Sequence, residues 1–276
     1  MARPLRIAYE GAFYHLTSRG NEKQPIFRTD MDRRFFLHTF LNVVQRFKWK
    51  CYAYCLMDNH YHLMVETLLA NVSDGMKYLN SVYSGYFNRI HKRVGHLFQG
   101  RFTGILVEKE SHGLELCRYV ILNPVRAGIC QEAAEYPWSS YQATLGLVSA
   151  PSFLDISWVL QQFGSNHKAA RAHYERFVRE GVDHCPWDEL KGQIYLGSDA
   201  FIQKLQDQQE EESSEIPQIQ LQPVRPSLSE LLKTDQGMHK AYWDHHYKIS
   251  EIADCKGVHY STISRWLQRI RRTGGA

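Results

Sequence analysis

Two histidines separated by one residue lie in residues 58–65, DNHYHLMV, whose composition predicts a β-strand. Successive side chains of a strand point to opposite faces, so His60 and His62 point one way and Tyr61 points the other. The preceding residues 50–57 are rich in β-forming types, and the Asp-Asn pair between the two segments is typical of a hairpin turn. This part of the chain is therefore expected to fold as an antiparallel hairpin with two imidazoles on one face.

The spacing alone leaves two interpretations of this pair open. The chain has 14 histidines among 276 residues, so two polar side chains on a solvated strand face are one interpretation. The other is a shared metal ion, because neutral imidazole is a common metal ligand. A metal ion needs further ligands, and the rest of the sequence must supply them.

A second polar group lies in residues 111–126, SHGLELCRYVILNPVR. Ser111 is a suitable helix N-cap, and the helix is expected to end near Pro124, because a residue before proline is biased away from helical geometry. Tyr119 and Asn123 are four residues apart and so share one helical face. Near a divalent metal, a tyrosine can attack a phosphodiester and form a phosphotyrosine. Packing is the alternative role for Tyr119, since the chain has 16 tyrosines.

Three blocks occur in order along the chain, namely residues 60–62 (HYH), 97–102 (LFQGRF) and 118–128 (RYVILNPVRAG). Together they resemble the single-tyrosine HUH transposases of the IS200/IS605 type, and most of all their REP-associated branch. The resemblance extends over roughly residues 5–145. It implies a small antiparallel sheet with helices packed on it, similar to the palm-like RNA-recognition topology.

The resemblance also implies a chemistry. It implies that His60 and His62 bind a metal, that Asn123 is the third ligand and that Tyr119 is the nucleophile. It implies Mg²⁺ or Mn²⁺, which suit phosphoryl oxygens, although imidazole also suits zinc and the spacing does not exclude zinc. The implied substrate is single-stranded DNA that folds into hairpins, such as repetitive extragenic palindromes (REP).

Local patterns along the first half agree with an α+β fold. Runs rich in β-forming residues alternate with longer stretches of helical periodicity. The expected strands are residues 12–18, 51–57, 60–67 and 102–108, and the expected helices are residues 30–47 and 73–93.

Positive charge is concentrated in the first half of the chain. Residues 1–150 hold 18 Lys and Arg against 12 Asp and Glu, whereas the net charge of the whole chain is +4. Residues 89–101 contain no acid, which suits a nucleic-acid backbone, with a solvated helix end as the alternative. The candidate DNA-binding cations of this half are Arg19, Lys23, Arg89, Lys92, Arg93 and Arg101.

Residues 249–267 resemble a helix-turn-helix motif. Ala253 is small enough for close helix crossing, Gly257 suits the tight turn, and Ile263 is expected to face the core. Residues 251–276 carry 5 Lys and Arg against 2 Asp and Glu, which favours DNA contact over a helical hairpin without that role. The side chains expected to meet DNA are Tyr260, Ser261, Thr262, Ser264, Arg265 and Arg269.

Length and composition bound the rest of the organisation. No run of about 18 apolar residues occurs, so no membrane contact and a cytoplasmic location are expected. The six cysteines form no Cys-x-x-Cys pair, and reduced thiols are expected. Four regions are expected: a nuclease domain at 1–147, a helical extension at 148–205, a linker rich in Gln, Glu, Ser and Pro at 206–228, and a helix-turn-helix module at 229–276.

The chain is thus predicted to be a metal-dependent endonuclease and strand transferase. It is expected to form a 5′-phosphotyrosine on hairpin-forming single-stranded DNA, in DNA transposition or mobilisation of REP-like DNA. One alternative is a non-catalytic regulator that binds hairpin or repeat DNA, and another is a hydrolase that uses water. Duplex DNA is a further expected partner of the helix-turn-helix, and both a monomer and a homodimer remain compatible with the sequence.

Overall fold

The computed structural model describes residues 7–182, 186–192, 194–212, 227–234, 237–243, 247, 249–263 and 265–266. The chain divides into two compact units, of which one is Arg6–Gln209 and the other includes Glu210–Ala276. Among the described residues, no helix is both long and apolar enough to span a membrane.

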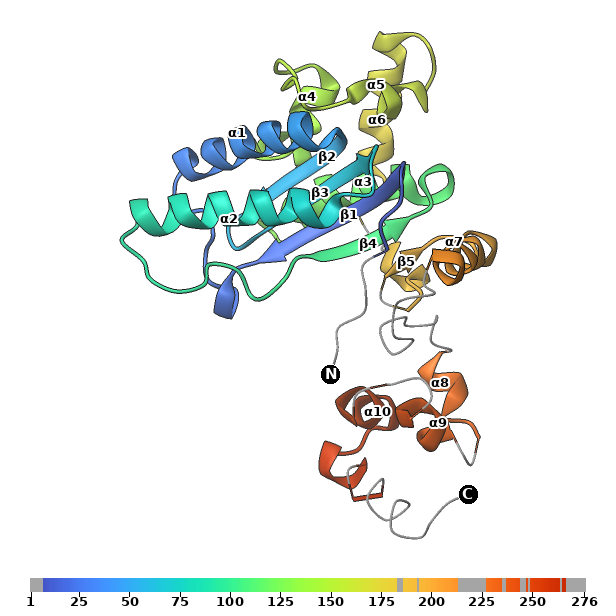
Figure 1. The fold of residues 1–276 in the computed structure, drawn as a ribbon. Coiled ribbons are helices and arrows are strands. Elements are labelled where there is room, and N and C mark those ends of the chain that lie inside the picture. The colour runs from blue at the N-terminus through green and yellow to red at the C-terminus, as the bar shows by residue number, and fades with distance from the viewer. Residues whose placement is uncertain are drawn as a thin grey trace. The chain divides into compact units, whose positions relative to one another are not determined.

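The first unit contains the strands β1 (Ala12–Arg19), β2 (Trp49–Met57), β3 (His60–Thr67), β4 (Thr103–Val107) and β5 (Tyr195–Leu196). They form one sheet in the order β2-β3-β1-β4-β5 (Figure 1). The first four pair antiparallel, and β5 runs parallel to β4. The predicted α+β class with an antiparallel sheet is confirmed. The fifth strand was not predicted, because two residues are too few to give a periodic pattern.

Helices α1 (Asp30–Phe47) and α2 (Val72–Ile90) pack side by side on one face of the sheet (Figure 1). Tyr61 of β3 points toward them: its ring lies 4.7 Å from that of Phe36 in α1, and its hydroxyl donates to Asn80 in α2 at 2.6 Å. Tyr61 is fully buried. The alternation predicted for β3 therefore places the two histidines on the opposite face.

Helix α3 (Lys109–Arg126) packs on β2 and β3. Buried apolar side chains of these three elements belong to one hydrophobic cluster. It begins at Lys109, so the prediction that Ser111 is the N-cap is wrong. The Ser111 hydroxyl lies 2.7 Å from the Glu108 carboxylate. The N-cap position belongs to Glu108, whose side chain accepts no capping bond.

The helix is expected to end near Pro124, and α3 continues through this proline and ends two residues later, at Arg126. Proline has no N–H to donate to the carbonyl four residues earlier, which belongs to Val120. The side-chain amide of Asn123 donates to that carbonyl at 3.3 Å and to the Tyr119 carbonyl at 3.0 Å. The missing donor is thus replaced locally, and both Tyr119 and Asn123 lie within one continuous helix.

The rest of the first unit is mainly helical. It comprises η1 (Asn21–Lys23), η2 (Ala133–Glu135), α4 (Tyr141–Leu145), α5 (Ile156–Gln161), α6 (His167–Arg179), η3 (Pro186–Glu189) and α7 (Asp199–Glu212). Helix α7 extends past residue 206, where the composition predicts a linker. Its Gln, Glu and Lys residues are good helix formers, so a polar composition does not exclude a helix there.

The second unit contains α8 (Leu228–Leu231), α9 (Gly237–Trp243) and α10 (Ile249–Lys256). Gly257 follows α10 with a φ of 64°, and residues 260–263 are again helical. Ala253 and Ile263 are buried in a small apolar core, as predicted. Of the residues predicted to meet DNA, Tyr260, Thr262 and Arg265 are exposed and Ser261 is half-buried, while Ser264 and Arg269 lie outside the described residues.

Close packing between α2 and β2 gives a test of the fold. A Cβ added at Gly75 would lie 2.2 Å from the Trp49 ring, and the Trp49 indole is held by a 2.8 Å hydrogen bond to Asn71. Overpacking of this kind costs about 1–3 kcal/mol. We expect Gly75→Ala to lower the free energy of unfolding in urea by that amount. Gly85→Ala in the same helix, where a Cβ meets nothing within 4 Å, is the control and should raise it; equal effects would contradict this packing.

Candidate active site

His60 and His62 lie on the face of the sheet that α3 covers. The register pairs His60 with Arg19 and His62 with Thr17 of β1, so these four side chains share that face. The ring of Tyr119, on α3, lies 6.4 Å from the His62 ring and nearly perpendicular to it. Two segments far apart in the sequence therefore bring a tyrosine beside the histidine pair.

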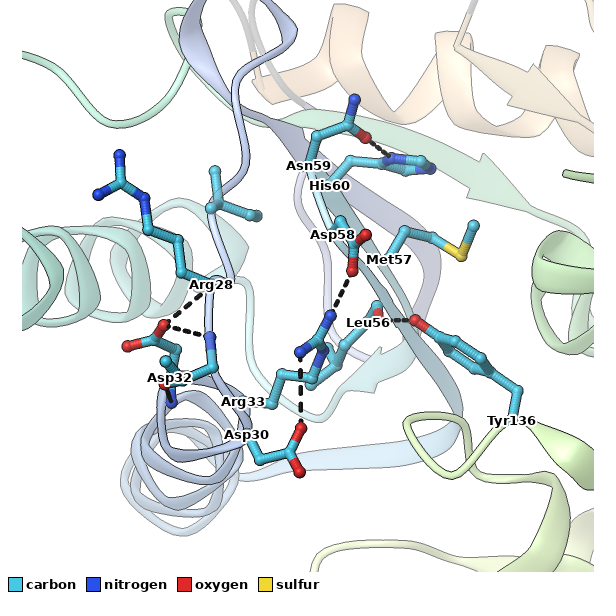
Figure 2. Close-up of polar contacts among 12 residues, drawn as sticks. Arg28, Asp30, Asp32, Arg33, Leu56, Met57, Asp58, Asn59, His60 and Tyr136 are labelled. Carbon is cyan, nitrogen blue, oxygen red and sulfur yellow. Dashed lines mark hydrogen bonds and ion pairs between the residues drawn. The ribbon is translucent and has the colours of Figure 1, made fainter. Parts of the chain in front are cut away.

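The orientation of the His60 ring is fixed by its neighbour. Its Nδ1 lies 2.6 Å from the side-chain oxygen of Asn59 (Figure 2). The Asn59 amide nitrogen donates to the Lys23 carbonyl at 3.1 Å, which fixes which end of the amide faces His60. An oxygen only accepts, so the proton of a neutral His60 ring lies on Nδ1. The Nε2 atom is left with a lone pair that can bind a metal.

The turn before His60 is held through Asp58, whose contact with Arg33 is drawn in Figure 2. The Asp58 carbonyl accepts from the N–H groups of Ile26 and Phe27 at 2.8 and 3.0 Å. The Asp58 carboxylate pairs with the guanidinium of Arg33 in α1. The same guanidinium lies 3.8 Å from the Asp30 carboxylate. The loop before α1 and the helix itself thus position the start of β3.

His62 presents a different arrangement. Its Nδ1 lies 2.8 Å from Nε2 of His15 in β1. Its Nε2 is buried and has no hydrogen-bond partner among the described residues. A buried polar atom without a partner is costly. A lone pair in that position, beside Tyr119, fits a metal ligand.

Burial keeps all three histidines neutral at neutral pH. It lowers the pKa of His60 to about 4, with a smaller contribution from the Arg19 charge. It lowers the pKa of His15 to about 3, and it holds the pKa of His62 well below its usual range. Only the neutral ring can bind a metal. His60 and His62 can therefore bind a metal ion at neutral pH without first losing a proton.

The Tyr119 ring is held by contacts on several sides. Trp187 of η3 meets it edge-on at 4.9 Å, and the Arg126 guanidinium lies 4.6 Å from its centre. Arg126 also donates to the carbonyls of Tyr119, Gly181 and Val182 at 3.2, 2.8 and 3.0 Å. The tyrosine is thus anchored to a segment that follows α6 in the sequence.

Asn123 has one atom available for a ligand. Its amide nitrogen donates to the backbone of α3, so the amide oxygen is the atom that can bind a metal. No group of three or more His, Cys, Asp or Glu side chains that could hold a metal occurs in the described part of the chain. A metal at His60 and His62 would therefore need an amide, a substrate oxygen or water to complete its shell.

Of the predicted DNA-binding cations, Arg19 and Lys23 are connected to the histidine strand or its turn. Arg19 is exposed and is the direct partner of His60 across the two strands. The Arg19 carbonyl accepts from the Gln99 N–H at 2.8 Å, so the segment that leads to Arg101 is bonded to the end of β1. Lys23 is exposed and its carbonyl holds Asn59. Arg89, Lys92 and Arg93 are at the end of α2 and in the loop after it; Arg93 is half-buried and the other two are exposed.

Residues 8–121 match the family model described as IS200-like transposase. The resemblance to these transposases is confirmed. The match includes His60, His62 and Tyr119 and ends before Asn123. It also ends before the segment that contains Trp187 and before the second unit. The histidine pair and the tyrosine of this structure therefore lie inside the residues that match this family model.

Comparison with solved structures found a REP-associated tyrosine transposase bound to a REP hairpin. That protein is 16% identical in sequence, with a TM-score of 0.46, and the match covers 57% of this chain and 91% of the other. No curated protein sequence matches the chain.

Four residues at the site were not predicted from the sequence: His15, Asn59, Arg126 and Trp187. The signal for His15 was present, because it lies on the same strand face as Arg19 once β1 is paired with β3. Asn59 was identified only as a turn residue. Arg126 lies seven residues after Tyr119, two helical turns along α3, and this spacing was the available signal for its contact with the Tyr119 ring. Trp187 had no usable signal, since its role depends on how the chain after α6 returns to α3.

The histidine cluster predicts how stability depends on pH. The unfolded chain binds protons on these histidines below about pH 6.5, whereas the folded chain resists them down to about pH 4 at His60 and about 3 at His15. The unfolded state thus gains protons first, so the free energy of unfolding should fall between pH 7.5 and 5.0. Urea titrations should show a smaller fall for His15→Phe, and an unchanged one for His38→Phe on the exposed side of α1. Equal falls in both variants would contradict the prediction.

Proposed function

We propose that this protein is a metal-dependent endonuclease and strand transferase for single-stranded DNA, with Tyr119 as its nucleophile. The Tyr119 oxygen attacks the scissile phosphorus, a P–O bond forms, and the bond to the 3′-oxygen breaks. The products are a 5′-phosphotyrosine and a free 3′-hydroxyl. Attack by another 3′-hydroxyl reverses the step and rejoins strands, so no nucleotide cofactor is consumed.

One observation carries the proposal: the partnerless buried Nε2 of His62 beside the ring of Tyr119. Nδ1 of His15 is likewise buried without a partner among the described residues, so it is the place of His62 Nε2 on the side of Tyr119 that supports a metal ligand. A buried ring nitrogen without a partner next to a phenol supports a metal and a nucleophile in one site. The transposase match over the same residues points to the same chemistry.

The chemistry of these residues suits a divalent ion: His60 and His62 would supply nitrogen ligands, and the Asn123 oxygen would supply the third. Such an ion, Mg²⁺ or Mn²⁺, would polarise the phosphoryl oxygen and stabilise the charge that develops on it. The chain itself supplies the rest: α3 places the tyrosine, Arg126 holds its ring, and Arg19 offers a cation for the phosphate beside the histidines.

The DNA would be held by exposed cations of the first unit, and we propose hairpin-forming, REP-like DNA as its substrate. Arg19 is paired with His60 across the sheet and the Lys23 carbonyl accepts from Asn59, which supports these two cations first; Arg101, Arg89 and Lys92 are also exposed. In the second unit, the exposed Tyr260, Thr262 and Arg265 follow the turn at Gly257, in the order expected of a helix-turn-helix. We propose that this module contacts duplex DNA.

The experiment is to incubate the full chain with labelled hairpin DNA that carries single-stranded flanks, with Mg²⁺ or Mn²⁺ and with EDTA in parallel. Denaturing electrophoresis should show a labelled protein band only when metal is present. Cleavage without a covalent band would support hydrolysis by water instead. Binding with neither cleavage nor adduct would support a regulator that binds DNA without reaction.

A further inference from the structure

His15 has no role in the chemistry described so far, yet it is buried against a proposed ligand. It is 3% exposed and lies on the sheet face of His62, one diagonal step away because Thr17 is the direct partner of His62. The two rings are nearly parallel, with their centres 5.0 Å apart. The Nε2 atom of His15 lies 2.8 Å from the Nδ1 atom of His62.

The direction of this hydrogen bond decides whether His62 can bind a metal. A neutral imidazole has one N–H and one lone pair. If His15 donated, the lone pair of His62 would be used on Nδ1, and its Nε2 would carry a proton toward the site. If His62 donates, its Nε2 holds a lone pair, and His15 must carry its own proton on Nδ1, which is also buried without a partner among the described residues. Only the second arrangement leaves a ligand atom.

We propose that His15 is a positioning residue that accepts the Nδ1 proton of His62 and thereby holds the Nε2 lone pair toward the metal. This inference rests on the proposed function. Metal-binding histidines commonly need such an outer partner, which fixes both the ring orientation and the tautomer. Asn59 does the same for His60 through its side-chain oxygen. The two proposed ligands therefore have two different outer partners.

His15 also contacts a residue that lies outside the transposase match. The ring of Trp187 lies 5.1 Å from that of His15 and also contacts Tyr119. Trp187 belongs to η3, well beyond residue 121 where the family match ends. Because His15 already holds the His62 ring in one orientation, the His62 side chain loses little conformational entropy when it binds the metal.

The test uses Mn²⁺ binding to the full chain, followed by the EPR signal of free Mn²⁺. His15→Phe keeps a ring but removes the acceptor, and we expect a dissociation constant about 10- to 100-fold higher. His15→Gln keeps an oxygen near the place of Nε2 and should remain within about threefold of the original chain, on the same reasoning. His38→Phe, an exposed histidine of α1, should bind as the original chain does.

Three outcomes separate the inference from the function beneath it. If His62→Ala leaves Mn²⁺ binding unchanged, the metal site itself is wrong. If His62→Ala weakens binding but His15→Phe does not, or if His15→Gln weakens it as much as His15→Phe, the role of His15 is wrong. Should His15→Phe fail to fold, nitrogen-15 spectra of the histidine rings in the unaltered, Mg²⁺-saturated chain decide. A proton on His62 Nδ1 supports the inference, and one on its Nε2 overturns it.

Discussion

Replacing Tyr119 by phenylalanine should abolish the covalent protein–DNA species and reduce metal-dependent cleavage by about 10³-fold or more, as expected when a nucleophile is lost. Phenylalanine keeps the ring that Trp187 and Arg126 contact. The variant should therefore fold normally and still bind hairpin DNA. Only the oxygen that would attack phosphorus is missing, so a loss of adduct cannot be attributed to a collapsed site.

Tyr78→Phe is the matched control for this experiment. Tyr78 is also a half-buried helical tyrosine, and the Arg46 guanidinium lies 5.1 Å from its ring centre, much as Arg126 lies near Tyr119. It projects from α2, on the opposite face of the sheet. We expect Tyr78→Phe to form adduct at the original rate. If Tyr119→Phe cleaved equally well, a water-using hydrolase would be the better account.

The second large effect is expected for His62→Ala. It removes the nitrogen whose lone pair is held open, and outer partners of metal ligands alone are commonly worth about 10- to 100-fold in affinity. Loss of the ligand itself should therefore raise the Mn²⁺ dissociation constant by about 100-fold or more and reduce cleavage in parallel. Isothermal calorimetry and a single-turnover cleavage assay measure the two effects separately.

The matched control is His38→Ala, which removes an exposed histidine from α1 without touching this face. A partial recovery of His62→Ala at high Mn²⁺ would agree with a ligand role, because mass action compensates for a weaker site. Unchanged Mn²⁺ affinity in His62→Ala, with cleavage lost, would mean that His62 acts on the reaction in some other way.

Much of the first unit follows from local sequence patterns. Strand alternation alone predicts that Tyr61 and His62 face opposite sides, and their contacts with Asn80 and Tyr119 agree with it. The start of α3 was mispredicted, and the helical conformation of Asn123 before Pro124 was not expected, for a specific reason. Capping and proline rules describe backbone preferences, whereas the Asn123 side chain replaces the donor that Pro124 lacks.

The outer contacts of the site could not be predicted in the same way. Trp187 reaches Tyr119 only because the chain after α6 returns to the sheet and adds β5 beside β4. A two-residue strand and a single turn of 3₁₀ helix leave no periodic signal. The pairing of His15 with His62 needed the register of two strands separated in sequence by α1 and β2, which neither segment encodes alone.

The most direct measurement is the polarity and location of the covalent bond. Hairpin DNA labelled at either its 5′ or its 3′ end is incubated with the full chain and Mg²⁺, and the adduct is digested for peptide mass spectrometry. The account predicts that protein retains only the 3′ label, that the 5′-labelled fragment is released with a free 3′-hydroxyl, and that the modified residue is Tyr119. Retention of the 5′ label, modification of another residue, or cleavage with no adduct would contradict it.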